Sequence, residues 1–245
     1  LSVYKENFFT CFFMKLKEMA HLRLHKPNNF GIQDSFNINR TFSKTNRGFA
    51  KRFIFFITRF FKSESSINFY NRLQQGTFKN HKVTKEYLNI LQDDDIDFLF
   101  FTHQRPPYIA PLIYASEKLK IPNGTFIFSW DNIASKGRMA GNFDYYFVWS
   151  DLMKLELLTF YKRVNTSQIK VVGTPQFEPY VLDRYKTDKN VFFEKFHLDN
   201  SYKTICFSCG DISTSKNDEL YIEFIAEAIL GSTIKEKVNF LVRTS

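Results

Sequence analysis

Polar side chains gather in five short stretches, and each follows an apolar run of the kind that forms buried β-strands. The densest is "SWDNIASKG" (129–137), which holds an indole, a carboxylate, an amide and a lysine directly after "TFIF". The others are "THQRPP" (102–107), "SD" (150–151), "GTPQFEPY" (173–180) and "SCGDISTSKND" (208–218). Because ligands of parallel α/β sheets bind beyond the carboxyl ends of the strands, this placement predicts a single shared crevice.

Two residues in these stretches are candidates for a general base. A histidine has an unperturbed pKa of about 6.5, so His103 is able to take a proton at neutral pH. Asp131 is able to accept a proton, to orient a hydroxyl group, or to cap the turn that follows it. A structural histidine and a structural aspartate are the alternatives, and the sequence leaves both open.

The neighbouring side chains are candidates for binding substrate. Arg105 and Lys136 carry charges suited to phosphate, the first as a planar fork and the second as a point charge. Asn132 would hold hydroxyl groups of an acceptor. Trp130 either stacks on a sugar ring or fills the core beneath the loop, and the core position is favoured.

The last two stretches are candidates for the other side of the crevice. Gln176 and Glu178 either line a cleft or only bridge two domains. "SCGDIS" follows a predicted strand and precedes a predicted helix, where a glycine lets backbone amides approach a diphosphate. The expected diphosphate ligands are Ser208, Gly210, Ser213 and Thr214.

Short β-rich runs alternate with helical patterns from about residue 95 onward, which predicts the α/β class. We expect a Rossmann-like parallel sheet with helices on both faces. A weakly patterned, charged stretch between residues 179 and 203 places a boundary near residue 185, with one domain at 1–185 and the start of a second at 186–245. The expected strands are 97–102, 124–129, 144–149, 169–173, 204–208 and 238–243, and the expected helices are 108–119, 150–162 and 217–230.

Positive charge is concentrated in the first third of the chain. The net charge is +9, and residues 1–82 alone hold 15 Lys and Arg against 4 Asp and Glu. Residues 46–62 form an amphipathic pattern with a basic and a phenylalanine-rich side, which either lies on an anionic membrane surface or packs its phenylalanines into the domain. Nucleic acid is not an expected partner, because the phenylalanines lie opposite the basic residues instead of among them.

No metal or cofactor is expected. Cys206 and Cys209 form one C-x-x-C pair without a second, and Cys206 falls inside a predicted strand, where burial is expected. His21 and His25 are four residues apart but lack the glutamate of a zinc-protease helix. Three cysteines and no visible secretory signal favour the cytoplasm, with peripheral association at the inner face of the cell membrane. The chain begins without methionine and stops after a strand, so a fragment is expected.

Five segments together resemble the glycosyltransferases that have two facing Rossmann-like domains, the GT-B fold, and specifically bacterial enzymes of surface-polysaccharide assembly. A neighbouring group comprises proteins similar to CDP-glycerol glycerophosphotransferases. The resemblance covers roughly residues 95–245 and rests on the order and spacing of the motifs. The segments are "FTHQR", "FSWDNIASKG", "VWSDLMKLELLTFY", "VVGTPQFEPY" and "ICFSCGD".

This resemblance implies transfer of a sugar from a nucleotide-sugar donor, held by the carboxy-terminal domain, to a lipid-linked or saccharide acceptor, held by the amino-terminal domain. It implies a reaction without a metal. The donor domain would be truncated at Ser245, so this piece alone is expected to be inactive. Alternatives on the same fold are CDP-glycerol or polyol-phosphate transfer and sugar-nucleotide epimerisation, and a basic nucleic-acid-binding protein is the alternative outside enzymes.

Overall fold

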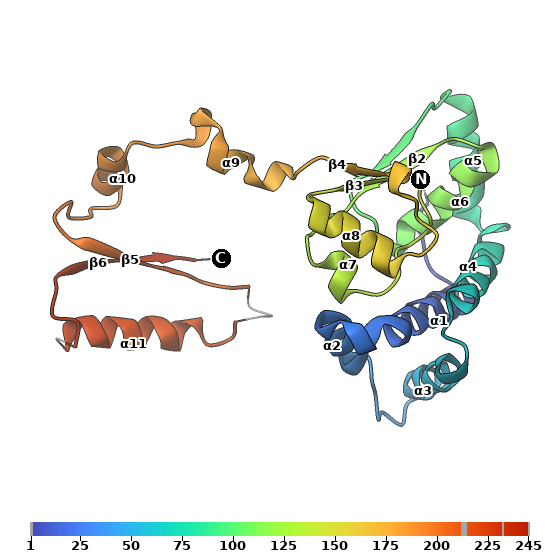
Figure 1. The fold of residues 1–245 in the computed structure, drawn as a ribbon, viewed down its shortest axis with the longest axis horizontal. Helices are drawn as coiled ribbons and strands as arrows, with labels where there is room; N and C mark the ends of the chain where they lie inside the picture. Colours follow the sequence, from blue (N-terminus) through green and yellow to red (C-terminus); the bar gives the residue numbers. More distant parts are fainter. Residues whose placement is uncertain (1, 212–214, 232, 245) are drawn as a thin grey trace. The chain divides into compact units, whose positions relative to one another are not determined.

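The computed structural model describes residues 2–211, 215–231 and 233–244. The chain divides into two compact units, Leu1–Pro175 and Gln176–Ser245, and each is described by itself (Figure 1). The expected boundary at residue 185 lies ten residues beyond this division. Gly173, near the end of unit 1, has a positive φ of 76°, which glycine readily adopts.

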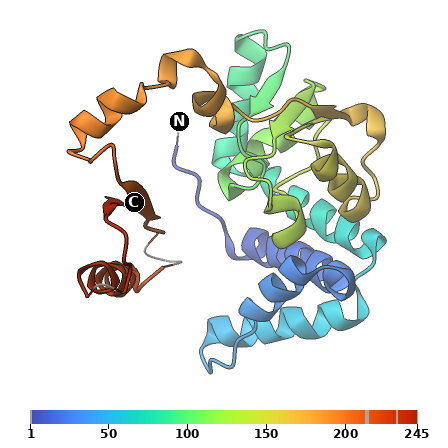
Figure 2. The same ribbon diagram turned by 60° about the vertical axis from the view of Figure 1, so that its left-hand side comes forward.

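Residues 8–93 of unit 1 form five α-helices and the turns between them. Polar side chains begin these helices: Asn7, Thr45 and Ser63 each accept a hydrogen bond from the backbone N–H three residues later, which satisfies a free amide of the first turn. In both views α1 lies between α3 and the sheet (Figures 1 and 2). The helices are α1 (Phe8–His25), α2 (Phe30–Ile38), α3 (Asn46–Phe60), α4 (Glu64–Phe78) and α5 (Lys82–Asp93), with a short 3-10 turn at Lys26–Asn28.

A parallel sheet of four strands forms the rest of unit 1. Its strands lie in the order β1-β2-β3-β4, so each is hydrogen-bonded to the next along the chain. The strands are β1 (Leu99–Phe101), β2 (Asn123–Phe126), β3 (Tyr145–Val148) and β4 (Ile169–Val171), and the main helices between them are α6 (Ala110–Leu119), α7 (Asn132–Ser135) and α8 (Asp151–Phe160). The parallel α/β prediction is therefore confirmed, and the expected strands coincide with the observed ones to within a few residues.

Only one face of this sheet belongs to the core. Phe101, Tyr146 and Ile169 point into a cluster with α1 and α8 and are almost fully buried. On the opposite face Phe98, Phe100 and Tyr145 are more than one third exposed. The expectation of helices on both faces is thus wrong for unit 1 as described. The strand order explains it, because right-handed crossovers between strands that advance in one direction all fall on the same side.

The exposed face carries a layer of aromatic rings. Phe98 lies 6.1 Å from Tyr145 and Phe100 lies 5.5 Å from Phe147, measured between ring centroids. Gly124 makes this layer possible, because a Cβ there would lie 2.8 Å from the Phe147 ring and 2.9 Å from the Phe98 ring. Cross-strand aromatic contacts of this kind stabilise the sheet without a covering helix.

Unit 2 contains two parallel strands joined by a helix. The elements are β5 (Lys203–Ser208), α11 (Asp218–Leu230) and β6 (Val238–Arg243), preceded by α9 (Glu178–Val181), α10 (Lys189–Lys195) and 3-10 turns at Pro175–Phe177 and Asp183–Tyr185. The two predicted strands and the predicted helix are confirmed. The expected burial of Cys206 is wrong, since its side chain is exposed.

The amphipathic segment 46–62 forms helix α3 as far as Phe60, and the core determines which side of the helix faces solvent. Ile54 and Thr58 face the core and are buried, whereas Phe53, Phe56 and Phe60 face away from it. Packing of all the phenylalanines into the domain is therefore wrong. In the described part of the chain, no helix has the length and apolar character needed to cross a bilayer.

Candidate functional site

One buried glutamine joins the loops that follow β1 and β2. The Gln104 side chain is 1% exposed, its Nε2 donates to Asn132 Oδ1 at 3.1 Å, and its Oε1 accepts from the backbone N–H of Phe128 at 3.1 Å. The backbone carbonyl oxygen of Gln104 also accepts a hydrogen bond from the backbone N–H of Ala140 at 3.0 Å. These bonds bring the predicted site stretches 102–107 and 129–137 together at the carboxyl edge of the sheet. Sequence reasoning missed Gln104.

His103 is held in one orientation and one protonation pattern. Its ring stacks on Phe128 with centroids 4.7 Å apart and planes 7° from parallel. Its Nδ1 accepts the backbone N–H of Arg105 at 3.1 Å, which assigns the proton of the neutral ring to Nε2. Burial and the charge of Arg105 lower the pKa of His103. At neutral pH this side chain therefore presents an N–H donor, and it can act as a base only if the Nδ1 bond breaks.

Asp131 stands at the centre of a small hydrogen-bond network. Its carboxylate accepts from Ser129 Oγ at 2.5 Å, from Ser135 Oγ at 2.9 Å and from Asn132 Nδ2 at 3.2 Å. Burial raises the pKa of Asp131, but these hydrogen bonds and Lys136 outweigh it, so the pKa lies below its usual value. A carboxylate has about four acceptor positions, so one stays open for a hydroxyl group.

The remaining candidate residues of unit 1 differ in whether their side chains are free to contact a ligand. Arg105 is engaged, because Nη1 donates to the Gly137 carbonyl at 2.5 Å and Nη2 pairs with Glu18 at 3.4 Å. Lys136 is exposed. Trp130 is 68% exposed, so the favoured core position is wrong. The exposed indole beside Asp131 and Asn132 leaves an aromatic surface open at the strand ends.

The candidates of unit 2 lie on a separate body. Gln176 and Glu178 are exposed, and Glu178 lies 3.9 Å from Arg184. Ser208 is exposed at the end of β5. The Gly210 amide expected to meet a diphosphate instead donates to Asp218 Oδ2 at 2.7 Å. Ser213 and Thr214 lie outside the described residues.

A second polar cluster is buried between α1, α4 and the loop before β3. One ring nitrogen each of His21 and His25 and one carboxylate oxygen of Glu64 lie within 4.8 Å of one another, close enough to hold a metal ion. Arg138 occupies both Glu64 oxygens, at 3.2 and 3.1 Å, and lies 3.3 Å from His21 Nδ1. Its guanidinium also stacks over Tyr161 at 4.2 Å. A cation already neutralises this carboxylate, so the cluster acts as a buried ion pair that ties the helices together.

No protein-family model, curated protein or solved structure matches this chain. The site must therefore be judged by its chemistry. The loops after β1 and β2 present an N–H donor at His103, an acceptor at Asp131 and an exposed ring at Trp130. This combination suits a ligand that offers hydroxyl groups and a flat apolar face.

Proposed function

We propose that this chain is part of a glycosyltransferase with two Rossmann-like domains, which transfers a sugar from a nucleotide-sugar donor to a saccharide or lipid-linked acceptor. The observation that carries the proposal is the bond from Gln104 to Asn132. It gathers an acceptor carboxylate, a histidine donor and an exposed indole at the carboxyl edge of a parallel sheet, where α/β proteins bind their ligands.

The reaction forms a bond between an acceptor hydroxyl oxygen and the anomeric carbon, and it breaks the bond from that carbon to the donor diphosphate. The hydroxyl proton must leave and the diphosphate must be stabilised. Asp131 orients the attacking hydroxyl and accepts its proton as the oxygen bonds to the anomeric carbon. His103 donates from Nε2 to a departing phosphate oxygen, and Trp130 stacks on a sugar face.

The test is release of nucleotide by the purified protein that contains this chain, with nucleoside-diphosphate sugars and CDP-glycerol as donors and oligosaccharides or lipid extracts as acceptors. Sugar transfer releases a nucleoside diphosphate. Polyol-phosphate transfer, the alternative on this fold, releases CMP from CDP-glycerol, so the product separates the two. Acceptor-dependent release of nucleoside diphosphate is the expected result.

Two substitutions connect the activity to the site. Asp131→Asn should lower turnover by about a hundredfold or more if the carboxylate takes part in proton transfer. His103→Phe keeps a ring that stacks on Phe128 but removes the donor, and it should lower turnover by about tenfold or more. Asp97→Asn is the matched control, because Asp97 is exposed beside the amino end of β1, at the opposite edge of the sheet. Unchanged turnover in Asp131→Asn would contradict the assignment.

A further inference from the structure

Four phenylalanines form a continuous stripe on the solvent side of α3. Phe49, Phe53, Phe56 and Phe60 recur at intervals of four, three and four residues and are 48–67% exposed. The opposite side of the helix holds the buried residues, so the core fixes the direction in which the stripe points. A contiguous exposed apolar surface of this kind marks an interaction site more often than an ordinary solvated face.

The segment around this stripe carries positive charge only. Residues 35–63 contain seven Lys and Arg and no Asp or Glu. Arg52 and Arg59 are exposed on α3, and because they are seven residues apart they lie together along one side of the phenylalanine stripe. An apolar stripe bordered by cations matches a bilayer surface, where the acyl chains lie beneath anionic headgroups.

A hollow between α1 and α3 extends the stripe. It has a volume of about 360 Å³, and its apolar wall includes Phe8, Phe12 and Ile54. The Phe12 ring lies 6.4 Å from the Phe53 ring, nearly parallel to it, so the wall and the stripe are continuous. Basic residues also border the hollow: Lys15, which pairs with Glu18 at 2.7 Å, Arg47 and Lys51.

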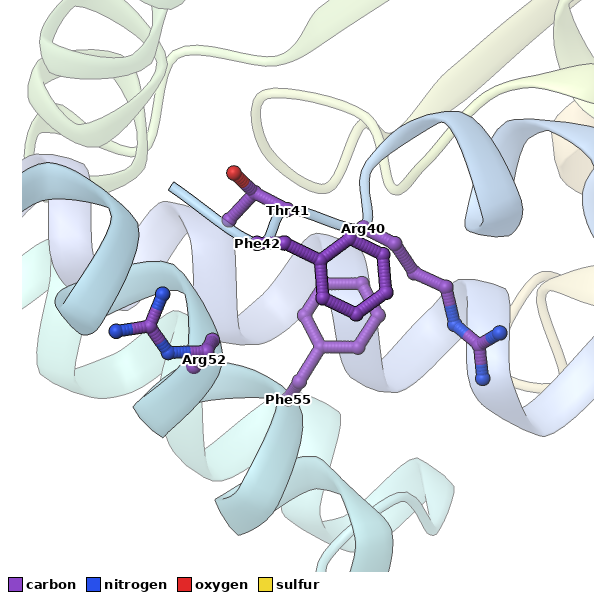
Figure 3. Close-up of a pocket in the computed structure, with 5 residues that line it drawn as sticks. All are labelled: Arg40, Thr41, Phe42, Arg52 and Phe55. Carbon is purple, nitrogen blue, oxygen red and sulfur yellow. The ribbon is translucent and has the colours of Figure 1, made fainter. Parts of the chain in front are cut away.

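A second hollow lies on the α2 side of α3 (Figure 3). It has a volume of about 350 Å³ and is lined by Phe42, Phe55, Thr41 and two arginines. Figure 3 shows the Phe42 ring over the Phe55 ring, with Arg40 on one side and Arg52 on the other. Both hollows therefore combine aromatic walls with cationic groups at the border, which is the pattern expected for phosphate headgroups above acyl chains.

We propose that this α1–α3 surface docks on a bilayer that contains anionic phospholipid. The phenylalanine stripe enters the boundary between headgroups and acyl chains, while Arg52, Arg59 and the basic residues of the hollows contact lipid phosphates. A second copy of the same surface is disfavoured because two segments of like charge repel each other. Nucleic acid is disfavoured because the exposed rings form one continuous stripe with the cations beside it. The inference does not depend on the proposed transfer activity.

Vesicle flotation tests the proposal on the chain as it stands. Vesicles of phosphatidylcholine with an equal part of phosphatidylglycerol should retain the protein, and vesicles of phosphatidylcholine alone should retain much less. Phe56→Ser should weaken binding to the anionic vesicles about tenfold. The matched control is Phe224→Ser on α11, since Phe224 is 63% exposed and Phe56 is 60% exposed.

The charge is tested by Arg52→Gln/Arg59→Gln, which should weaken binding to anionic vesicles by about tenfold or more and should leave weak binding to neutral vesicles unchanged. Circular dichroism checks that each variant is folded, which is expected because all four substituted side chains are exposed. Three results would overturn the proposal. The first is equal flotation of Phe56→Ser and Phe224→Ser. The second is a wild-type protein that does not bind vesicles but self-associates, with the self-association lost in Phe56→Ser, and the third is binding of single-stranded oligonucleotide in place of vesicles.

Discussion

Replacement of Gln104 by methionine tests whether this side chain holds the candidate site together. Methionine has a similar length and no branch, so it fills nearly the same volume, but it makes neither of the two side-chain hydrogen bonds. The substitution leaves the Phe128 N–H and the Asn132 Oδ1 without their partners at 3.1 Å. The prediction concerns the free energy of unfolding of unit 1.

The expected loss is about 2–4 kcal/mol. A buried polar group that loses its partner costs about 1–3 kcal/mol, and two groups are affected. Asn132 is only half-buried and Phe128 is 48% exposed, so water replaces part of both lost bonds and the sum falls in the lower part of the range. Gln33→Met on the exposed face of α2 is the control, and it should change the free energy by less than about 0.5 kcal/mol.

Urea denaturation followed by tryptophan fluorescence is the appropriate assay. The two tryptophans of the chain, Trp130 and Trp149, both belong to unit 1, so the signal reports that unit alone. Gln104→Met should unfold at clearly lower urea than the wild type and Gln33→Met should not. If both variants unfold at the urea concentration of the wild type, Gln104 does not join the two loops as described.

Two further predictions concern the buried charges of unit 1. Burial lowers the pKa of Lys17 from 10.5 to about 7. Between these two pH values the unfolded chain keeps a proton that the folded chain has lost, so the free energy of unfolding should rise with pH. In Lys17→Met the rise should flatten, and pH-dependent denaturation that leaves the two slopes equal would contradict the assignment. Arg138→Met should lower the free energy of unfolding by about 3–5 kcal/mol, because the Glu64 carboxylate loses the two hydrogen bonds from Arg138. Arg138→Met/Glu64→Met should recover part of this loss, and a double variant without recovery in chemical denaturation would contradict the ion pair.

The sheet was largely predictable from the sequence. Its strands are short runs of apolar and aromatic residues that end in polar stretches, and both features are local. The covering of the sheet was not predictable, because it depends on the order β1-β2-β3-β4, which no local pattern encodes. Phe98 and Phe100 illustrate this, since their residue type suggests burial whereas the strand order leaves their face open.

The candidate site was predictable in its location but not in its internal roles. His103, Asp131 and Asn132 were found by residue type, yet the donor role of His103 follows from a backbone bond to its Nδ1 that spacing does not reveal. Gln104 lies between His103 and Arg105 in the sequence and was not predicted as a site residue, because its burial, which makes it the link between the loops, is not visible in the sequence. In α3 both sides of the helix are apolar in part, so only tertiary packing could decide which phenylalanines face solvent.

The most direct test of the account is the indole N–H resonance of Trp130 in a ¹H–¹⁵N correlation spectrum during titration with acceptor saccharide and nucleotide sugar. Trp149 is an internal reference, because its indole donates to the Ile127 carbonyl at 2.8 Å. The account predicts a saturable shift of the Trp130 resonance with little change at Trp149, and loss of that shift in Asp131→Asn. Turnover of the same ligands with an unmoved Trp130 resonance would place the site elsewhere in the protein.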